Sequence, residues 1–352
     1  MQGSLDRIRR VVAGEKPDRP PLFDLLHNDA VFRHFNSGVP VEIGDDRTGA
    51  RAMAAAIDGS RSSRLSPSEE RTERTDDGRE VRVLRWTAWH ERRKYESSEH
   101  YRELKARQAA ELLELAGRPV DTARDSHYLR EREVRSWFPD DFYYLLCPPH
   151  TGLMGIWEEV GLEPFSYYLY DCEEAIIGQL EANTQYACRW AEGLPADDPF
   201  EAVFIGEDIA FKTGPMIQVK WLEKHYFHRL ARVIAALHAR GKKVMFHSDG
   251  NLNAIMDGLV EAGADILNPI ERMAGMDLAD LHRRYPKLVF AGGIDVSHLL
   301  PFGKPQEIRE AVVQAIEETE GQILVGSSTE VHNLVPLENF LGMREAALRY
   351  RW

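Results

Sequence analysis

From about residue 140 onward, the sequence alternates short apolar segments with longer amphipathic ones in a regular rhythm. The apolar segments have the composition of strands: "DFYYLLC", "EAVFIGED", "KKVMFHSD", "DILNPIE", "KLVFAGGID" and "GQILVGSS". A segment with helical periodicity follows each of them, and the connections are short. Strand–helix alternation of this kind predicts a parallel sheet. Nearly continuous apolar strands such as "LVFA" indicate that both faces of the sheet are buried.

One further strand is expected near the amino terminus, where "PLFDLL" reads as a buried apolar segment that leads to His27. This brings the expected strands to seven, and the sequence marks no eighth. We therefore predict a (β/α)8 TIM barrel in which one strand is weakly marked. A doubly wound open sheet is the alternative fold. No glycine fingerprint of the GxGxxG or GxxxxGK[ST] type follows any strand, which disfavours the nucleotide-binding form of that alternative.

The amino-terminal part departs from this rhythm. The pattern of residues 3–14 predicts a short amphipathic helix. An insertion is expected over about residues 30–138. The elements expected within the insertion are a β-hairpin or meander over Arg79–Ser97 and amphipathic helices over 99–117 and 120–137. The chain, 1–352, is thus predicted to be a single barrel domain with N-terminal helical decoration and a β-hairpin insertion.

The charge balance and the cysteine content limit the classes of partner and compartment. The chain has 44 Lys and Arg against 57 Asp and Glu, so its formal net charge is −13, which argues against nucleic-acid and anionic-membrane binding. No run approaches the roughly 18 apolar residues of a membrane-spanning helix, and the start of the chain lacks the apolar core of a signal peptide. The 3 cysteines show no CxxC spacing, which argues against a disulfide framework. We expect a cytoplasmic protein. A homodimer is expected only because such oligomers are common.

Ionisable side chains follow nearly every predicted strand. In a parallel barrel the active site lies at the carboxyl ends of the strands. These side chains are therefore expected to meet at one mouth, as a polar catalytic site requires. In chain order they are His27 and Asn28, Cys147 and His150, Glu207 and Asp208 with Lys212 nearby, His247 and Asp249, Glu271, Asp295, and Glu330 and His332.

We predict three overlapping roles for this ring. The predicted catalytic groups are Glu207, Asp208, His247 and Asp249. His247, Asp249, Glu207 and Glu330 are also of residue types that can bind a divalent metal, since zinc accepts His and carboxylate ligands. The residues predicted to contact the substrate are His27, Asn28, Lys212, Glu271, Asp295 and His332.

Structural alternatives stay open for several of these residues. His247 would also fit as a hydrogen-bonded core residue. Asp249 precedes the predicted helix "LNAIMDGL", so its carboxylate would also fit as the cap of that helix. A structural role is favoured slightly for Glu330 and His332, because they follow the last strand on a loop whose course the sequence does not define.

Five segments together resemble the uroporphyrinogen decarboxylase superfamily. They are "RIRRVVAGEKPDRPPLF", "VMFHSDGN", "GADILNPIE", "AGGID" and "VPLENFLGMREAALRY". The resemblance spans nearly the whole chain and implies a (β/α)8 barrel with N-terminal helices. It also implies either porphyrinogen decarboxylation or cobamide-dependent methyl transfer. True uroporphyrinogen decarboxylases have an arginine-rich loop similar to "RQAGRYLPEY" after the first strand. The matching "LLHNDAVFRHFNSG" lacks those arginines, so the resemblance is closer to the methyltransferase side.

The methyltransferases of this superfamily bind zinc through a His-x-Cys pair after one strand and a Cys after the last. The His-x-Cys position matches His247-Ser248-Asp249, so the His is kept and Asp stands in place of Cys. The last Cys position falls near Ser328 or Thr329. The resemblance therefore implies a harder metal site, with zinc or another divalent metal held by His247, Asp249, Glu207 and Glu330. Such a site suits an oxygen-bearing substrate.

Three functions follow from these observations. The first is metal-assisted transfer of a methyl group from a small substrate, such as a methoxylated one, to or from an external corrinoid protein. The corrinoid has to come from a partner because the sequence contains no DxHxxG segment. The alternative is decarboxylation without metal, by Asp and His acid–base chemistry, with Lys212 or Arg272 holding the substrate carboxylate. The second alternative is a barrel that binds a small ligand without catalysis.

Overall fold

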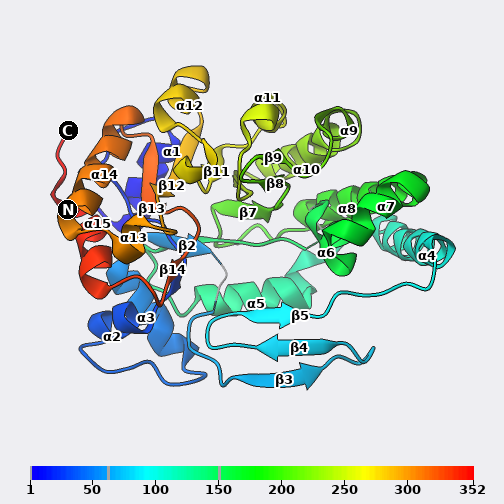
Figure 1. Cartoon of the computed structure of the whole chain (residues 1–352), viewed down its shortest axis with the longest axis horizontal. Helices are drawn as coiled ribbons and strands as arrows, with labels where there is room; N and C mark the ends of the chain where they lie inside the picture. Colours follow the sequence, from blue (N-terminus) through cyan, green and yellow to red (C-terminus); the bar gives the residue numbers. More distant parts are fainter. Residues whose placement is uncertain (1, 62–63, 150–151) are drawn as a thin grey trace.

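The computed structural model describes residues 2–61, 64–149 and 152–352, so His150 lies outside the described residues. The centre of the molecule is a five-stranded parallel sheet with the strand order β13–β12–β11–β10–β7 (Figure 1). Its strands are β7 (Ala202–Gly206), β10 (Lys243–His247), β11 (Ile266–Asn268), β12 (Val289–Ile294) and β13 (Ile323–Ser327). All five were predicted from the strand–helix alternation.

Three shorter parallel segments join the two edges of this sheet. The strand β6 (Tyr143–Leu145) continues into Leu146, which pairs with Val203 of β7. The strand β2 (Gly59–Arg61) pairs with β6. Residues 22–23 pair with β2 on one side and with β13 on the other. The segments therefore form a closed ring of parallel strands, and the predicted (β/α)8 barrel is confirmed.

The barrel strand that the sequence does not mark is β2. It consists of Gly59, Ser60 and Arg61 and has no apolar pattern. It lies inside residues 30–138, which were predicted to be an insertion, so that prediction is corrected here: β2 belongs to the barrel. The helices α2 (Asp29–Phe35) and α3 (Asp46–Ala56) precede it, and the true insertion follows it.

This insertion lies between β2 and β6. It contains an antiparallel sheet, seen at the bottom of Figure 1, and helices that pack against the barrel (Figure 1). The hairpin predicted over Arg79–Ser97 is the β4–β5 part of that sheet. The elements are β3 (Arg71–Arg74), β4 (Glu80–Val83), β5 (Ala88–His90), α4 (Ser98–Ala116), η1 (Thr122–Arg124) and α5 (Ser126–Arg135).

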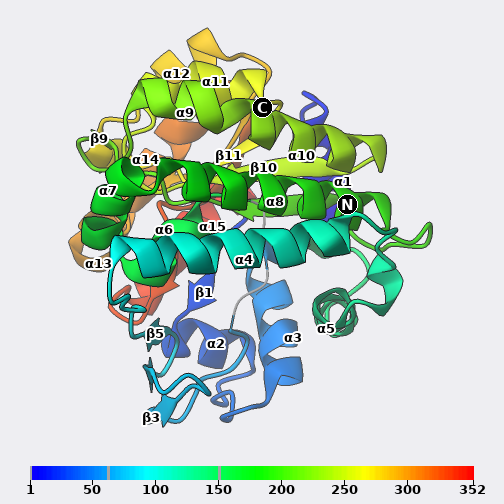
Figure 2. The ribbon, with the colours of Figure 1, turned by 90° about the vertical axis from the view of Figure 1, so that its right-hand side faces the viewer.

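The remaining helices cover the outside of the barrel. Figure 2 shows α4 lying alongside α8, with α10 on the other side of α8, and both helix pairs are in contact. The helices are α6 (Met154–Val160), α7 (Leu162–Asp171), α8 (Glu173–Glu192), α9 (Val219–His225), α10 (Phe227–Ala239), η2 (Asn253–Ile255), α11 (Met256–Glu261), η3 (Arg272–Ala274), α12 (Leu278–Arg284), α13 (Leu299–Phe302), α14 (Pro305–Glu318) and α15 (Leu337–Arg349). Two short strand pairs lie near the carboxyl ends of the barrel strands: β1 (Leu26–His27) with β14 (Val331–His332), and β8 (Ala210–Phe211) with β9 (Gly214–Pro215).

The interior of the barrel is packed with side chains, as in other barrels of this class. The buried cluster inside it includes Phe23, Tyr143, Leu145, Ala202, Phe204, Met245, Ile266, Val289, Ala291 and Leu324. Ile8 and Val11 of α1 (Ser4–Val12) join this cluster, so α1 closes the amino-terminal end of the barrel. Because side chains alternate along a strand, the next inward position after Met245 is His247.

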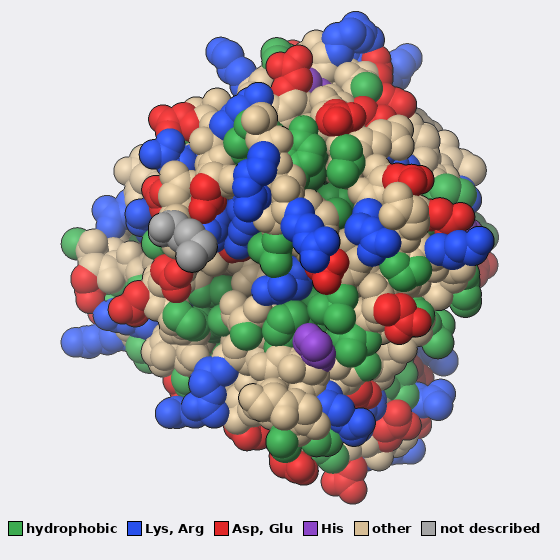
Figure 3. Space-filling model, turned by 90° about the vertical axis from the view of Figure 1, so that its left-hand side faces the viewer, with side chains coloured by type: hydrophobic (Ala, Val, Ile, Leu, Met, Phe, Trp, Pro, Cys, Tyr) green, Lys and Arg blue, Asp and Glu red, His purple; other side chains and the backbone are tan. Residues whose placement is uncertain are grey.

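The surface carries both signs of charge. On the face that holds both chain ends in Figure 1, Lys and Arg are interspersed with Asp and Glu, and the apolar patches between them are small (Figure 3). Within the described ranges, the structure contains no helix with the length and apolar character needed to cross a bilayer.

Candidate functional site

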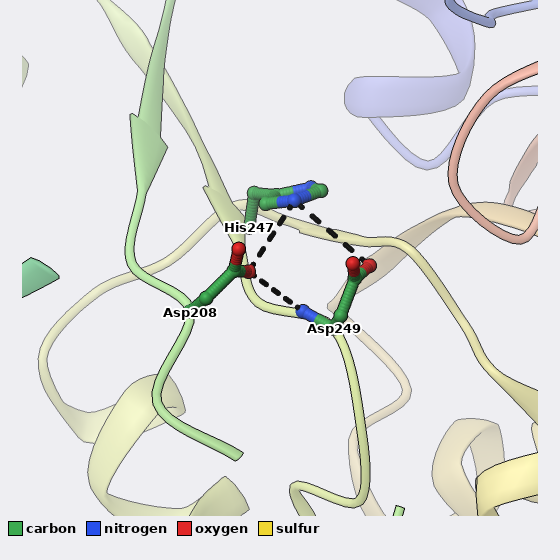
Figure 4. A group of neighbouring side chains, drawn as sticks. All are labelled: Asp208, His247 and Asp249. Atoms are coloured by element: carbon green, nitrogen blue, oxygen red, sulfur yellow. Dashed lines mark hydrogen bonds and ion pairs between the residues drawn. The ribbon is translucent and has the colours of Figure 1, made fainter. Parts of the chain in front are cut away.

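Three metal-capable side chains meet at the carboxyl ends of two neighbouring strands. Asp208 follows β7, His247 ends β10, and Asp249 follows it two residues later. One ligand atom from each of them lies within 4.8 Å of the other two. The His247 Nε2 is 3.6 Å from Asp208 Oδ1 and 4.0 Å from Asp249 Oδ1 (Figure 4). Within the described part of the chain, this is the only group of three or more His, Cys, Asp or Glu side chains with such spacing.

The orientation of the His247 ring is fixed from behind by Asn268. Nδ1 of His247 lies 2.7 Å from Asn268 Oδ1, and Asn268 Nδ2 donates to the Ala291 carbonyl at 3.4 Å. Because the amide nitrogen of Asn268 faces a carbonyl, its oxygen faces the ring and accepts a hydrogen bond from the Nδ1–H group. The lone pair of the neutral ring is therefore on Nε2, on the side of the two carboxylates. A hydrogen bond to the remote nitrogen is the usual support of a metal-binding His.

Burial and crowding alter the protonation of this cluster. Burial raises the pKa of Asp249 to about 7, and the negative charges of Asp208 and Glu271 add to this effect. Burial also lowers the pKa of His247, and the charge of Asp208 only partly offsets it. Near neutral pH the ring is therefore neutral and able to act as a ligand, since only the unprotonated nitrogen binds a metal.

Asp249 contacts Asp208 through its backbone, and one oxygen of its carboxylate has no donor among the described residues. Its own backbone N–H donates to Asp208 Oδ1 at 3.1 Å. Its Oδ1 is buried and accepts no hydrogen bond from the described residues. A buried carboxylate oxygen without a donor costs free energy. A cation bound beside the neutral ring would offset the repulsion between the two crowded carboxylates.

A second pair, His27 and Glu330, lies at β1 and at the loop before β14. His27 Nδ1 is 2.8 Å from Glu330 Oε2, and the His27 ring stacks on Trp86 with centroids 5.8 Å apart. Burial acts to raise the pKa of Glu330, but the interaction with His27 outweighs it and the pKa is lowered. Glu330 was predicted to bind metal, but the structure pairs it with His27 instead of bringing it into the Asp208–His247–Asp249 cluster.

Glu207 was predicted to be catalytic and a metal ligand, and the structure places it elsewhere. Its Oε2 accepts hydrogen bonds from the backbone amides of Leu153 and Met154, at 2.8 and 2.9 Å, at the start of α6. The side chain is fully buried, which raises its pKa to about 7. Since Phe204 points into the barrel, the two-residue period of the strand turns Glu207 away from it. The placement of Glu207 in the metal site is therefore corrected.

The residues predicted to contact the substrate lie in different surroundings in the structure. Glu271 is at the site: it accepts a hydrogen bond from the Gly250 amide at 2.8 Å, and burial and the charge of Asp208 raise its pKa. Lys212 is exposed on the turn between β8 and β9. His332 is half-buried in β14.

Asn28 and Asp295 have structural roles that use their polar atoms. Asn28 accepts from the Ala30 and Val31 amides and donates to the carbonyls of His332 and Val335. Asp295 accepts from the amides of Ser297, His298 and Leu299, in the turn that leads into α13. These hydrogen bonds give both side chains a structural role, and their contact with substrate stays a prediction.

Sequence reasoning missed three residues of the mouth. Arg61 ends β2, and its guanidinium carbon lies 4.2 Å from the centre of the Phe204 ring. Its charge acts on the protonation of His247, Asp249 and Glu330. Asn268 ends β11 in the same way as His247 ends β10, and that strand-end position is the signal that would have identified it.

The third missed residue is Asp24, which is buried beside β13. It accepts hydrogen bonds at 2.7 Å from both the amide and the hydroxyl of Ser327. Burial raises its pKa to about 7, although these hydrogen bonds act in the opposite direction. Its position inside "PLFDLL", between apolar neighbours, is a signal of a buried carboxylate. Arg272, proposed as a substrate cation, instead pairs with Glu318 and donates to the Gly293 carbonyl.

Comparison with known proteins agrees with the resemblance seen in the motifs. Residues 197–350 match the family model described as uroporphyrinogen decarboxylase. This range contains Asp208, His247, Asp249 and Asn268. No curated protein matches the sequence. The similarity to the uroporphyrinogen decarboxylase superfamily is thus confirmed in the part of the chain that carries the site.

Two solved structures superpose on this chain at low sequence identity. A methyltransferase from Methanosarcina mazei superposes with a TM-score of 0.66 at 13% identity, over 99% of this chain and 98% of that one. A B12-independent methionine synthase from Shewanella sp. W3-18-1 superposes with a TM-score of 0.48 at 10% identity, over 94% and 96% of the two chains. At these identities the first match shows a common fold, and the second is too distant to support an argument.

Proposed function

We propose that this relative of the uroporphyrinogen decarboxylases is a metal-dependent methyltransferase, with Asp208, His247 and Asp249 as the metal ligands. The observation that carries the proposal is the convergence of these three side chains at the carboxyl end of the barrel, with ligand atoms within 4.8 Å of one another. The substrate that such a site suits is a small molecule with a methylated oxygen, because carboxylate and imidazole ligands favour a harder metal than thiolates do.

The residues present fit a divalent metal such as zinc. The unpartnered Oδ1 of Asp249 supplies a buried oxygen ligand, and the Asn268 hydrogen bond directs Nε2 of His247 toward the same point. The neighbouring carboxylates repel one another, as the raised pKa of Asp249 indicates. When bound, the metal would act as a Lewis acid on the substrate oxygen.

Glu271 is suited to handle the proton of the reaction. Removal of a methyl group from an oxygen leaves negative charge on that oxygen, which a nearby acid can neutralise. Glu271 is half-buried and within electrostatic reach of Asp208, and burial and that charge raise its pKa, which favours the protonated form of its carboxyl group. Glu271 takes the place of Glu207, whose carboxylate is committed to the start of α6.

The methyl group is proposed to pass to or from a corrinoid on a separate protein. The sequence contains no corrinoid-binding segment of the DxHxxG type. The mouth of the barrel, where the three ligands lie, is the end at which (β/α)8 enzymes meet their substrates. A corrinoid protein would therefore dock over this end.

We expect Asp249→Asn to slow methyl transfer by about 10- to 100-fold, because the neutral amide of Asn is a weaker metal ligand than the charged carboxylate of Asp. The assay follows conversion of cob(I)alamin to methylcob(III)alamin by absorbance, with a panel of methoxylated aromatic acids and zinc-loaded protein. Asp295→Asn is the matched control, since Asp295 also follows a barrel strand but its carboxylate accepts the backbone amide of Leu299 at the start of α13. Equal turnover by wild type and Asp249→Asn, or turnover that resists a chelator, would contradict the assignment.

Decarboxylation is the second candidate, and it is favoured by the description of the matching family. Arg61 at the mouth supplies a cation for a substrate carboxylate, in place of Lys212 or Arg272. In this alternative Asp249 would stabilise a cationic intermediate and His247 would donate the proton. Release of carbon dioxide by metal-free protein, lost in Arg61→Met, would favour it over methyl transfer.

A further inference from the structure

Glu207 lies beside the proposed metal cluster without belonging to it. Its side chain is buried, and its Oε2 accepts hydrogen bonds from the backbone amides of Leu153 and Met154, at 2.8 and 2.9 Å. The next residue in the chain is Asp208, one of the three proposed metal ligands. A contact that fixes residue 207 therefore also limits where Asp208 can lie.

The amides that Glu207 binds are themselves held in place by α8. The Nδ2 of the buried Asn183 donates to the Gly152 carbonyl at 3.0 Å. This carbonyl and the Leu153 amide belong to the same planar peptide unit, so Asn183 holds one end of the unit and Glu207 the other. Gly152 also lies close to the carboxylate, because an added Cβ there would overlap Glu207 Oε1. The start of α6 is therefore a fixed support against which the Glu207 side chain fits closely.

The backbone at Glu207 joins the ends of two neighbouring strands. Its N–H donates to the His247 carbonyl at 2.8 Å, which continues the pairing of β7 with β10. The Oδ1 of Asp208 lies 3.6 Å from His247 Nε2 and accepts a hydrogen bond from the Asp249 amide at 3.1 Å. Glu207 therefore links α6, through its side chain, to the strand that ends at the proposed histidine ligand.

Ser248 holds the same segment on the other side of Asp208. The buried Ser248 hydroxyl accepts a hydrogen bond from the Ile209 amide at 3.1 Å and donates to the Asp249 carbonyl at 3.0 Å. The residues before and after Asp208 are thus both fixed by hydrogen bonds. The Asp208 carboxylate extends from between them toward His247 (Figure 4).

We propose that Glu207 is a positioning residue for the metal centre: its carboxylate holds the end of β7 against α6 and so keeps Asp208 beside His247 and Asp249. This inference rests on the proposed metal site and adds to it a residue that does not contact the metal. Both donors to Glu207 are neutral amides, so the role requires an oxygen acceptor at the right distance. Without that acceptor two backbone amides lose their partner, and a shift of the strand end becomes favourable.

The test is titration of metal-free, full-length protein with Co²⁺, whose visible absorption depends on the geometry of its ligands. Glu207→Gln keeps an oxygen acceptor on a side chain of the same length, so we expect its Co²⁺ affinity and spectrum to match those of wild type. Glu207→Ala removes the acceptor. We expect it to bind Co²⁺ about 10- to 100-fold more weakly, as for other residues that support a metal ligand, and with an altered spectrum.

Asp58→Ala is the matched control for a loss of stability alone. Asp58 is also a buried carboxylate that accepts a backbone amide, that of Leu22, but it precedes β2 at the opposite end of the barrel. We expect this variant to keep the wild-type Co²⁺ spectrum. If Glu207→Ala does not fold, as judged by circular dichroism, Glu207→Asp decides in its place. It keeps the charge but is one methylene too short to reach the α6 amides, so weaker Co²⁺ binding is expected there too.

The outcomes separate this inference from the proposed function. If wild type does not bind Co²⁺, the metal site itself is contradicted, and the positioning role with it. If wild type binds Co²⁺, three results overturn the positioning role alone. They are unchanged binding in the deciding variant, a loss in Glu207→Gln as large as that in the deciding variant, and an equal spectral change in Asp58→Ala. Loss in Glu207→Ala, with the wild-type spectrum kept in Glu207→Gln and Asp58→Ala, is the expected pattern.

Discussion

His247→Ala is expected to lower the affinity of the protein for zinc at least about 100-fold, because removal of an outer-shell partner alone costs 10- to 100-fold and here the ligand itself is removed. The loss follows from geometry: Nε2 of His247 lies between the two carboxylates, 3.6 Å from Asp208 and 4.0 Å from Asp249. Without the ring, two crowded carboxylates remain, and one of them already has a pKa near 7. The measurement is competition against a chromogenic zinc chelator at fixed pH.

Two further variants sharpen this experiment. Asn268→Ala keeps the imidazole but removes the acceptor of its Nδ1 proton, so an intermediate loss of about 10- to 100-fold is expected. His332→Ala is the matched control, because His332 is a half-buried His near the same end of the barrel but outside the cluster. Zinc binding by His247→Ala as tight as that of wild type would refute the proposed ligand set.

Asp58→Ala is expected to destabilise the fold by about 3–5 kcal/mol, the usual cost of removing one partner from a buried ion pair. Asp58 is 2% exposed and lies just before β2. It accepts hydrogen bonds from both guanidinium nitrogens of Arg19, at 2.7 and 2.8 Å, and from the Leu22 amide at 2.8 Å. It also pairs with the buried Arg7 of α1 at 3.2 Å. The substitution therefore removes one partner of Arg7, at the point where residues 22–23, β2 and α1 meet.

The stability loss is measured from urea unfolding of wild type and variant. Asp6→Ala is the matched control on α1, because Asp6 pairs with Arg10 at the surface, where such a pair contributes about 0–1 kcal/mol. Burial acts to raise the pKa of Asp58, but Arg19 outweighs it and holds the pKa below its usual value. Since the folded pKa is depressed, the stabilisation is present above the unfolded pKa of about 4 and is lost as the pH falls through the folded pKa. A variant within 1 kcal/mol of wild type at neutral pH, on the scale of a surface pair, would show that this network does not hold the barrel closed.

The sequence predicted seven of the eight barrel strands, and the one that it did not mark is β2. From β7 to β13 each strand is a run of apolar residues, and the helices between them have one apolar face. By contrast, β2 is Gly-Ser-Arg and is held by its neighbours β6 and residues 22–23 rather than by its own pattern. Tertiary pairing decided its conformation, and no local propensity could have shown it. The helices that follow β6 are α6, α7 and α8, and Gly161, at φ 86°, lies at the break between the first two.

The sequence predicted the candidate site only in part. The rule that polar residues at strand ends converge brought together Asp208, His247, Asp249 and Glu271. The rule does not state which of two adjacent carboxylates faces inward. Strand alternation counted from Phe204 and Met245 would have separated Glu207 from Asp208, because side chains two residues apart share a face. Arg61 was beyond reach, since the strand that carries it was not predicted.

The metal content of the protein tests the central claim most directly. Wild type and His247→Ala would be purified without an affinity-metal step and examined by elemental mass spectrometry. The proposed centre of Asp208, His247 and Asp249 predicts near one divalent metal per chain in wild type and its loss in the variant. Absence of metal from both proteins, even after wild type is incubated with zinc, would contradict the account, and the cluster would then have to act through proton transfer alone.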